Sequence, residues 1–271
     1  MASLKPAEIT DAVINAGISK AEGSARRLVM LGILAGAFIA FAAAGSNMAA
    51  FNALGDAQTY GYGRWIAGVV FATGLMLVVC CGAELFTGNT LMICSVLEKK
   101  ITAARMLRNW IIVYAANMAG SVLIAYMVIH TGLLSSGDGA LGTATVNIAA
   151  GKCSLAFMPA FYRGILCNWL VCLAVWMASG SETMTGKFLS CLFPISLFVT
   201  SGYEHSVANM YYIPAGLFAK AEYSSSIDPS MLDSLTWGHF FVNNLIPVTL
   251  GNIVGGAVFV GMIYWLVYKR S

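Results

Sequence analysis

Apolar and polar residues alternate along this chain in long blocks. Five blocks contain no Asp, Glu, Lys or Arg: residues 28–55, 65–83, 109–137, 164–181 and 234–268. A sixth apolar block, 188–219, is interrupted only by Glu204 and His205. Each block is close to or longer than the ~20 residues that an α-helix needs to cross the bilayer core. The pattern therefore predicts an all-α membrane protein with six transmembrane spans.

Two polar octets interrupt the second and fifth spans in the same way. They are GAELFTGN at 82–89 and GYEHSVAN at 202–209, and they share Gly at the first place, Glu at the third and Asn at the last. An exposed peptide group costs several kcal/mol in hydrocarbon, so unwound backbone persists there only where protein or a water-lined cavity satisfies it. We therefore expect both spans to be broken at the octets.

The carboxylates of Glu84 and Glu204 allow two interpretations. A carboxylate at mid-membrane costs at least ~2.5 kcal/mol on insertion scales, so it needs a role. One role is a proton relay. The other, which we favour, is structural: each carboxylate caps freed backbone N–H groups of its own break. Asn89 and Asn209, at the last place of each octet, are expected to structure the same loops.

Shorter motifs repeat along the chain with the octets. GIL occurs at 32–34 and 164–166, and N-x-x-G occurs at 117–120 and 252–255. Spans one to three, over 28–136, thus repeat as spans four to six, over 157–268. Because three is an odd number of crossings, the second copy runs inverted, as in transporters whose interrupted helices meet near the midplane. The positive end of each half-helix favours a small anion, so the two breaks are predicted to form an anion pore.

Composition and charge support this class. Only 10% of the residues are charged and 59% are hydrophobic, whereas typical soluble domains are about 25% charged. With six spans, eleven of the 15 Lys and Arg residues fall on one side of the membrane. The positive-inside rule then puts both termini in the cytoplasm. These cations flank the spans, which argues against a patch that binds nucleic acid.

The N-terminal segment, 1–27, is predicted to be an amphipathic helix on the cytoplasmic surface, within a single domain over 1–271. A cleaved signal peptide is the alternative, but the apolar run continues to Gly55 and is too long for one. The seven cysteines show no CxxC spacing. They predict no disulfide framework, no metal site and no cofactor, with a pair involving Cys153 as the alternative.

Three polar side chains are candidates for contact with a substrate. His205 lies on a break beside a glutamate, and the first octet has Leu85 at the matching place. An imidazole can hydrogen-bond an anion or lend it a proton near neutral pH; the alternative is a satisfied core histidine. Thr87 offers a hydroxyl donor. Lys152 lies at the outer edge of the fourth span. At a pore mouth it would raise the local anion concentration and oppose protonation of the entering anion. The alternative is an ordinary loop lysine.

Bulky apolar residues near the breaks are either ordinary core or constrictions that exclude hydrated cations. Spacing along the sequence leaves both possibilities open for Leu75, Phe86, Val171, Leu197 and Phe198.

Four stretches resemble the motifs of the formate/nitrite transporter family, which contains formate, nitrite and hydrosulfide channels. They are GAELFTGN, GILCNWLVCLAVWMA, SGYEHSVANM and IPVTLGNIVGG, and the resemblance extends from the N-terminal helix to Tyr268. It implies an aquaporin-like protomer with six spans and a pore of its own, assembled as a homopentamer in the cytoplasmic membrane of a prokaryote. LFTGNT differs from the LFTST common among formate channels and is closer to nitrite- and hydrosulfide-type members, which leaves the anion open.

The same resemblance implies roles for individual residues. Thr87 would reach the pore, and His205 would lie between two constrictions. Phe71 and Leu75 would lie on the cytoplasmic side, and Phe86, Val171 and Phe198 would lie toward the periplasmic side. Polar positions along the path would be Asn168, Asn252, Lys152 and, near the cytoplasmic end, Lys20.

The sequence thus predicts a channel, with no catalytic residues, for small monovalent anions of weak acids: formate, nitrite or hydrosulfide. Hydrogen bonds or transient protonation at His205 would replace part of the water that the anion gives up. A proton-coupled anion symporter is the nearest alternative. A pore for neutral solutes is less favoured because neither octet contains an NPA motif, and a haem-bearing respiratory subunit would normally need histidines on facing spans.

Overall fold

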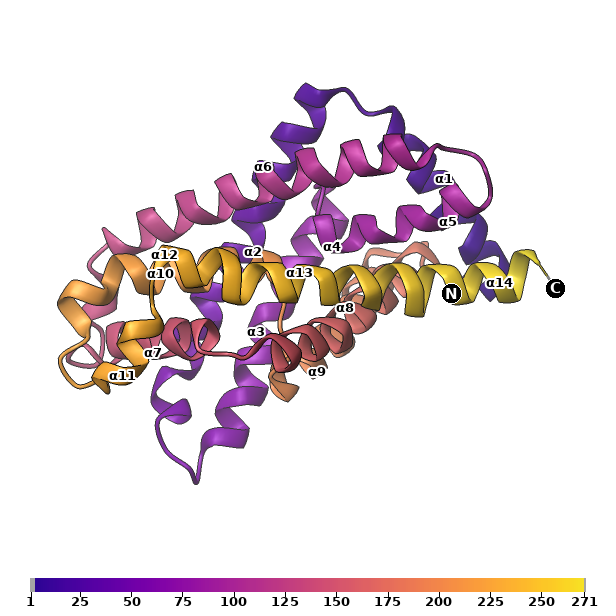
Figure 1. Ribbon diagram of the computed structural model, residues 1–271. Helices are drawn as coiled ribbons and strands as arrows, with labels where there is room; N and C mark the ends of the chain where they lie inside the picture. Colours follow the sequence, from indigo (N-terminus) through magenta and orange to yellow (C-terminus); the bar gives the residue numbers. More distant parts are fainter. Residues whose placement is uncertain (1–2, 271) are drawn as a thin grey trace.

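Six long apolar helices pack together in the computed structural model of the protein, which describes residues 3–270 (Figure 1). The uninterrupted spans are α2 (Ala25–Leu54), α6 (Ala103–Ile129) and α8 (Phe157–Ser179). A composite last span, Trp237–Lys269, joins α12 (Trp237–His239), η3 (Phe240–Leu245), α13 (Ile246–Ile253), η4 (Val254–Met262) and α14 (Ile263–Lys269), of which η3 and η4 are π-helical. The predicted all-α architecture with six spans is confirmed.

The second and fifth spans are broken at the two octets, as predicted. The helix α3 (Tyr60–Cys81) ends before Gly82, and the chain resumes in α4 (Phe86–Asn89), η1 (Thr90–Met92) and α5 (Ile93–Leu97). The helix α9 (Met184–Ser201) ends before Gly202, and the chain resumes in α10 (Ser206–Tyr223). Both glycines have a φ of 79°, in the left-handed region where a side chain would be strained.

Each set of three spans is preceded by a shorter helix. The first is α1 (Pro6–Glu22), which contacts α5, η1 and α14. The second is α7 (Ala140–Cys153), which packs along α10 and which the sequence analysis did not single out. The remaining short elements are η2 (Leu133–Ser135) and α11 (Pro229–Ser234). The two short helices therefore occupy corresponding places in the two repeats.

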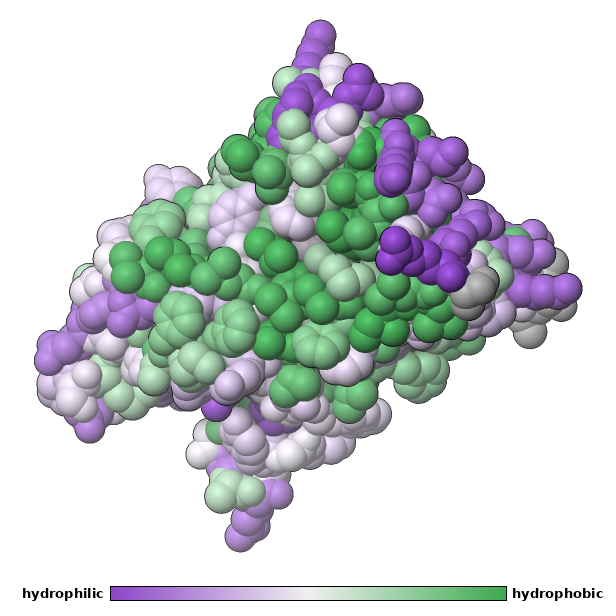
Figure 2. Space-filling model, turned by 45° about the vertical axis from the view of Figure 1, so that its right-hand side comes forward, coloured by the Kyte–Doolittle hydropathy of each residue, from purple (hydrophilic) through white to green (hydrophobic). Residues whose placement is uncertain are grey.

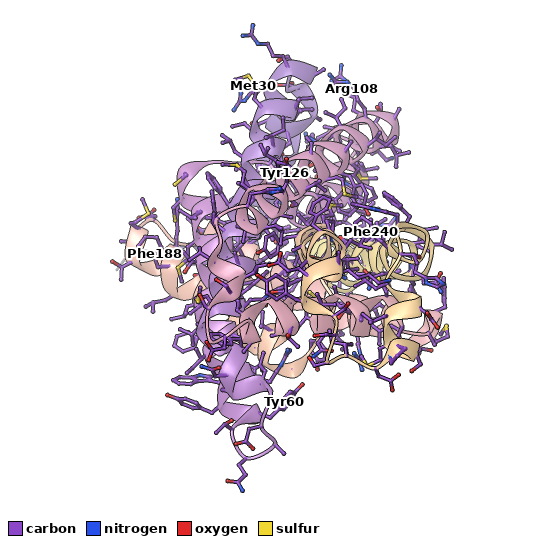
Figure 3. The ribbon with its side chains drawn as sticks, turned by 90° about the vertical axis from the view of Figure 1, so that its left-hand side faces the viewer. Met30, Tyr60, Arg108, Tyr126, Phe188 and Phe240 are labelled. Carbon is purple, nitrogen blue, oxygen red and sulfur yellow. The ribbon has the colours of Figure 1, made fainter. Side chains whose placement is uncertain are left out.

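Hydrophobic side chains cover the middle of the face in Figure 2, and hydrophilic ones gather toward its ends. In Figure 3, Arg108 and Tyr60 lie at opposite ends of the molecule, with Tyr126 between them. Many large apolar side chains on the outside are exposed, among them Ile111 (69%) and Phe193 (68%). An apolar belt between polar ends fits a protein surrounded by lipid.

The glycines of the repeated short motifs lie where helices cross. A Cβ at Gly120 would lie 2.0 Å from the Ile33 carbonyl oxygen, across the contact between α6 and α2. A Cβ at Gly255 would lie 2.3 Å from the Ile165 carbonyl oxygen, across the contact between the last span and α8. Glycine is needed at both positions because it lets the two backbones approach each other. The repeat seen in the sequence is thus a repeat of helix crossings.

We predict that Gly120→Ala lowers the stability of the purified protein by about 1–3 kcal/mol, because the added methyl group overpacks a backbone contact. Gly151→Ala is the matched control. Gly151 is a helical residue of α7, and a Cβ there would meet no heavy atom within 4 Å. Thermal unfolding in detergent measures both. Equal unfolding midpoints for the two variants would contradict the proposed close crossing.

Candidate functional site at the paired helix breaks

The first break is held by Asn117, a fully buried residue of α6. Its Oδ1 accepts a hydrogen bond from the Phe86 N–H (2.9 Å), the first N–H of the half-helix that follows the break. Its Nδ2 donates to the carbonyl oxygens of Gly32 (2.8 Å) and Glu84 (2.9 Å). One amide therefore satisfies three buried peptide groups and ties the break to the first and third spans.

The second break is held in the same way by Asn252, on the last span. Its Oδ1 accepts from the Ser206 N–H (2.9 Å), and its Nδ2 donates to the carbonyl oxygens of Gly164 (2.8 Å) and Glu204 (3.0 Å). The glycines that accept these bonds open the two GIL motifs, and the asparagines open the two N-x-x-G motifs. The repeated motifs are thus one hydrogen-bonding unit used twice.

The carboxylate of Glu84 binds side chains and not the backbone N–H groups that we expected. Its Oε1 pairs with Lys20 Nζ on α1 (2.9 Å), and its Oε2 accepts from Asn89 Nδ2 (2.7 Å). Asn89 Nδ2 also donates to Asn109 Oδ1 on α6 (2.8 Å). The expected capping was wrong in its partners because Asn117 already serves the backbone.

The carboxylate of Glu204 repeats this arrangement. Its Oε1 pairs with Lys152 Nζ on α7 (2.9 Å), and its Oε2 accepts from Asn209 Nδ2 (2.7 Å). Asn209 Nδ2 also donates to Asn244 Oδ1 (2.7 Å), and Asn244 Nδ2 donates to the Lys152 carbonyl oxygen (2.9 Å). Each break thus carries a lysine whose charge is balanced by its own glutamate. Loss of one member would leave a poorly solvated charge.

His205 is where the two breaks differ. Its Nδ1 accepts from the Ala208 N–H of α10 (3.0 Å), so the imidazole acts as the N-cap of that helix. Its Nε2 lies 3.0 Å from Thr87 Oγ1 on α4. Because a backbone N–H can only donate, the Nδ1 lone pair is occupied, and in the neutral imidazole the proton is assigned to Nε2. His205 therefore donates to Thr87 and links the two half-helices.

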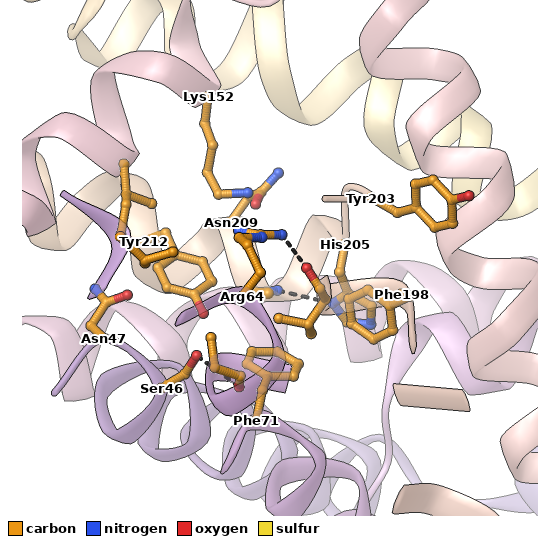
Figure 4. A pocket seen from close by; sticks show the side chains of 15 residues that line it. Ser46, Asn47, Arg64, Phe71, Lys152, Phe198, Tyr203, His205, Asn209 and Tyr212 are labelled. Carbon is orange, nitrogen blue, oxygen red and sulfur yellow. Dashed lines mark hydrogen bonds between the residues drawn. The ribbon is translucent and has the colours of Figure 1, made fainter. Parts of the chain in front are cut away.

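His205 lines a small cavity of about 70 Å³, which we call the Lys152 vestibule (Figure 4). Phe71 and Phe198 meet there edge to face, with ring centroids 5.7 Å apart. The Phe198 ring lies 6.0 Å from the His205 ring, and the Phe71 ring lies 6.4 Å from that of Tyr212. The expectation that Phe71 lies with Leu75, on the opposite side from Phe198, was wrong because the two phenylalanine rings form one apolar wall.

A second cavity of about 280 Å³, which we call the Lys20 vestibule, is lined in part by residues of the first break. Its lining includes Lys20, Leu75, Leu85 and Val175. Thr87 itself is fully buried, two residues from Leu85. The bond between Thr87 and His205 therefore connects the segment that borders one vestibule with a residue that lines the other.

Two of the predicted path residues serve as braces. Asn168 is fully buried, and its Nδ2 donates to the carbonyl oxygens of Asn252 (2.6 Å) and Thr87 (3.2 Å) and to Thr90 Oγ1 (3.2 Å). The Asn252 side chain is committed to the second break. Neither asparagine is among the residues that line the two vestibules: Asn168 holds the turn at Thr87, and Asn252 holds the second break.

Three residues that were predicted to form constrictions line neither vestibule. Leu197 is 53% exposed on the outside of α9, one position from buried Phe198, so its prediction was wrong. Phe86 packs edge to face on Tyr114, with ring centroids 4.9 Å apart, and lines neither vestibule. Val171 is buried on α8, one turn before Val175 of the Lys20 vestibule. Phe86 is drawn to the aromatic side chains of α6, which sequence spacing did not reveal.

The analysis of the sequence missed the partners of the glutamates, although the repeat contains a signal for them. Lys20 and Lys152 have the same separation as the two GIL motifs, 132 residues, and Asn109 and Asn244 have the same separation as the two N-x-x-G motifs, 135 residues.

All seven cysteines are free. Within residues 3–270, no group of three or more His, Cys, Asp or Glu side chains is arranged to hold a metal ion.

We predict that Asn244→Leu lowers the stability of the protein by about 1–3 kcal/mol, because it leaves an Asn209 amide N–H and the Lys152 carbonyl oxygen buried without partners. Asn243→Leu is the matched control, because Asn243 is the exposed neighbour on the same span. Thermal unfolding of both purified variants measures the difference. If Asn243→Leu destabilises the channel as much, the buried network is not the cause.

Comparison with known proteins places the chain. The sequence model of a family described as "Formate/nitrite transporter" matches residues 7–266. The chain is 41% identical over 259 residues to a "Probable formate transporter" of Methanothermobacter thermautotrophicus, with 90% of each chain covered. It is 40% identical over 266 residues to the "Formate channel FocA" of Haemophilus influenzae, covering 96% of this chain and 93% of that one.

Solved structures give the same result. A "Pentameric formate channel with formate bound" aligns with a TM-score of 0.77 at 36% identity, covering 90% of this chain and 97% of that chain. An "FNT family ion channel" aligns with a TM-score of 0.82 at 30% identity, covering 96% and 98%. With a family match over nearly the whole chain and broken spans at both octets, the protein belongs to the formate/nitrite transporter family.

Proposed function

We propose that this protein is a channel for small monovalent anions of weak acids, with formate as the first candidate. The observation that carries the proposal is the hydrogen bond between His205, which lines the Lys152 vestibule, and Thr87, whose neighbour Gly88 lines the Lys20 vestibule. Relatives at 40% and 35% identity bear the name formate channel. Nitrite and hydrosulfide follow as candidates because LFTGNT departs from the commoner formate-channel motif.

The anion is met by a polarised chain of donors. The Ala208 N–H at the positive end of α10 donates to His205 Nδ1, and His205 Nε2–H donates to Thr87 Oγ1. The Thr87 hydroxyl proton is then free to point at the anion. Each bond in such a chain strengthens the next. The role of His205 is therefore to hold and polarise the Thr87 hydroxyl. A proton on Nδ1 would point at the Ala208 N–H, and two donors would then face each other with no acceptor between them.

Apolar side chains on either side of the donor set the barrier. Phe71 and Phe198 face it from the Lys152 vestibule, and Leu75 and Leu85 face it from the Lys20 vestibule. An anion stripped of water in a low-dielectric region is costly, whereas the neutral acid is not. The anion of a weak acid therefore crosses by taking a proton from hydronium in one vestibule, which leaves water, and by returning that proton to water in the other vestibule, which regenerates the anion and hydronium.

Assembly and membrane placement follow from the same comparisons and from the charge pattern. We expect five copies, as in the structure described as a pentameric formate channel, each with its own path. Both termini would face the cytoplasm of a prokaryote, because eleven of 15 Lys and Arg residues lie on that side. The Lys20 vestibule would then open to the cytoplasm.

A proton-coupled symporter is the nearest alternative. It would accumulate formate against a concentration gradient, whereas a channel dissipates one. A pore for neutral solutes would carry water or glycerol with no preference for weak acids. The preference for weak acids measured below distinguishes the pore for neutral solutes, and accumulation of formate, as against simple dissipation of its gradient, distinguishes the symporter.

We predict rapid uptake of formate into proteoliposomes, increasing as the external pH falls because the crossing species carries a proton. Nitrite and hydrosulfide are measured beside it. Chloride, the anion of a strong acid, is expected to enter at least tenfold more slowly, since it gains nothing from protonation. Stopped-flow recordings over a pH series measure all four. Chloride uptake as fast as that of formate would defeat the protonation step, and uptake no faster than in protein-free vesicles would defeat the channel itself.

We predict that His205→Asn separates the two roles of the imidazole. Asparagine is a favoured N-cap, so the stability of the channel is kept, but its shorter side chain does not reach Thr87. Formate uptake is expected to fall about tenfold, the loss of one polarised hydrogen bond. His205→Ala should lose uptake and also about 1 kcal/mol of stability. Uptake at the wild-type rate in His205→Asn would show that the bond to Thr87 is not used.

A further inference from the structure

Arg64 lies near the beginning of α3 and lines the Lys152 vestibule (Figure 4). Its guanidinium donates to two carbonyl oxygens near the C-terminus of α9: Nη2 donates to Val199 and Nε donates to Thr200 (3.4 Å). Two of its five N–H donors are used in this way, and the others are available to the vestibule.

The charges around the vestibule make Arg64 distinctive. Lys152 was expected to attract anions, but its charge is balanced by Glu204 at 2.9 Å. Among residues 3–270, Arg64 forms no ion pair with a carboxylate, so it provides the uncompensated positive charge of this cavity. The carboxylates of Asp56 and Asp138 lie in the adjoining wider cavity, which Arg64 also borders.

The carbonyl groups that Arg64 binds are the negative end of a helix. The α9 helix ends at Ser201, three residues before Glu204 and next to the vestibule, and a helix C-terminus carries about half a negative charge. Uncompensated, this end would repel an anion that approaches His205. The second repeat has Met184, an exposed residue, where inverted symmetry would require a second arginine against the end of α3. The arginine is therefore present only on the side that has the histidine.

We propose that Arg64 is a specificity-determining residue of the Lys152 vestibule. It cancels the negative end of α9 and supplies the positive potential that concentrates anions in front of the wall formed by Phe71 and Phe198. This inference rests on the proposed function as an anion channel. A matched arginine, Arg163, is exposed at the start of α8 and lines neither vestibule.

The test compares Arg64→Gln, Arg64→Lys and Arg163→Gln in proteoliposomes, with stopped-flow formate uptake as a function of formate concentration. At an ionic strength of about 0.01 M, Arg64→Gln is expected to raise the half-saturating concentration roughly tenfold with little change in the maximal rate. At about 1 M salt the increase should shrink to less than about twofold, because the charge is screened. Arg64→Lys, which keeps the charge, should recover most of the wild-type affinity, and Arg163→Gln should match the wild type.

A purely structural role gives a different result. If Arg64 only fixes the end of α9, Arg64→Gln and Arg64→Lys will both reduce the maximal rate or the yield of folded protein, with unchanged half-saturation and unchanged salt dependence. That outcome, or equal effects of Arg64→Gln and Arg163→Gln, overturns the inference. Uptake by the wild-type protein distinguishes failure of this inference from failure of the proposed function. If vesicles with wild-type protein take up formate, the proposed channel function stands even when the Arg64 variants contradict the inference.

Discussion

A helix that breaks inside a membrane leaves peptide groups that lipid cannot solvate, and this constraint organises the whole protein. One asparagine in each repeat resolves it. Asn117 and Asn252 each bind the carbonyl of a break, the first N–H of the following half-helix and a carbonyl of the first span of the repeat. These bonds are short only because glycines let the helices cross closely. The close crossings and the breaks are therefore linked through the same two asparagines.

The six spans, the two breaks and the inverted repeat could be predicted because hydropathy and repeated motifs are properties of the sequence itself. The partners of Glu84 and Glu204 could not be read in the same way. They depend on how two short helices, α1 and α7, fold back against the breaks and bring Lys20 and Lys152 to the carboxylates. A lysine in a helix on the membrane surface has the same local sequence whether it meets lipid, water or a buried glutamate.

The apolar residues show a second limit. Leu197 and Phe198 are neighbours with similar hydropathy, yet one is 53% exposed and the other is 3% exposed. Successive side chains point in different directions around a helix, so the face that meets the pore is set by packing between helices. Phe86 lies against Tyr114 for the same reason, and the path on that side is lined by Leu85, a residue that drew attention only as the counterpart of His205.

The symmetric positions build the scaffold, and the departure from symmetry at His205 lies beside the vestibules. His205 corresponds to Leu85, whereas Asn168, which corresponds to Gly36, lines neither vestibule and braces the turn at Thr87. Leu85 gives the Lys20 vestibule an apolar wall, whereas His205, on the other vestibule, holds the Thr87 hydroxyl as a donor. A second histidine in place of Leu85 would hold an anion from both sides, and conduction requires binding weak enough to release the ion. One donor beside an apolar exit meets that requirement. Under the proposed function, the loss of exact symmetry is therefore what allows two nearly equivalent halves to form a passage through which an anion moves on.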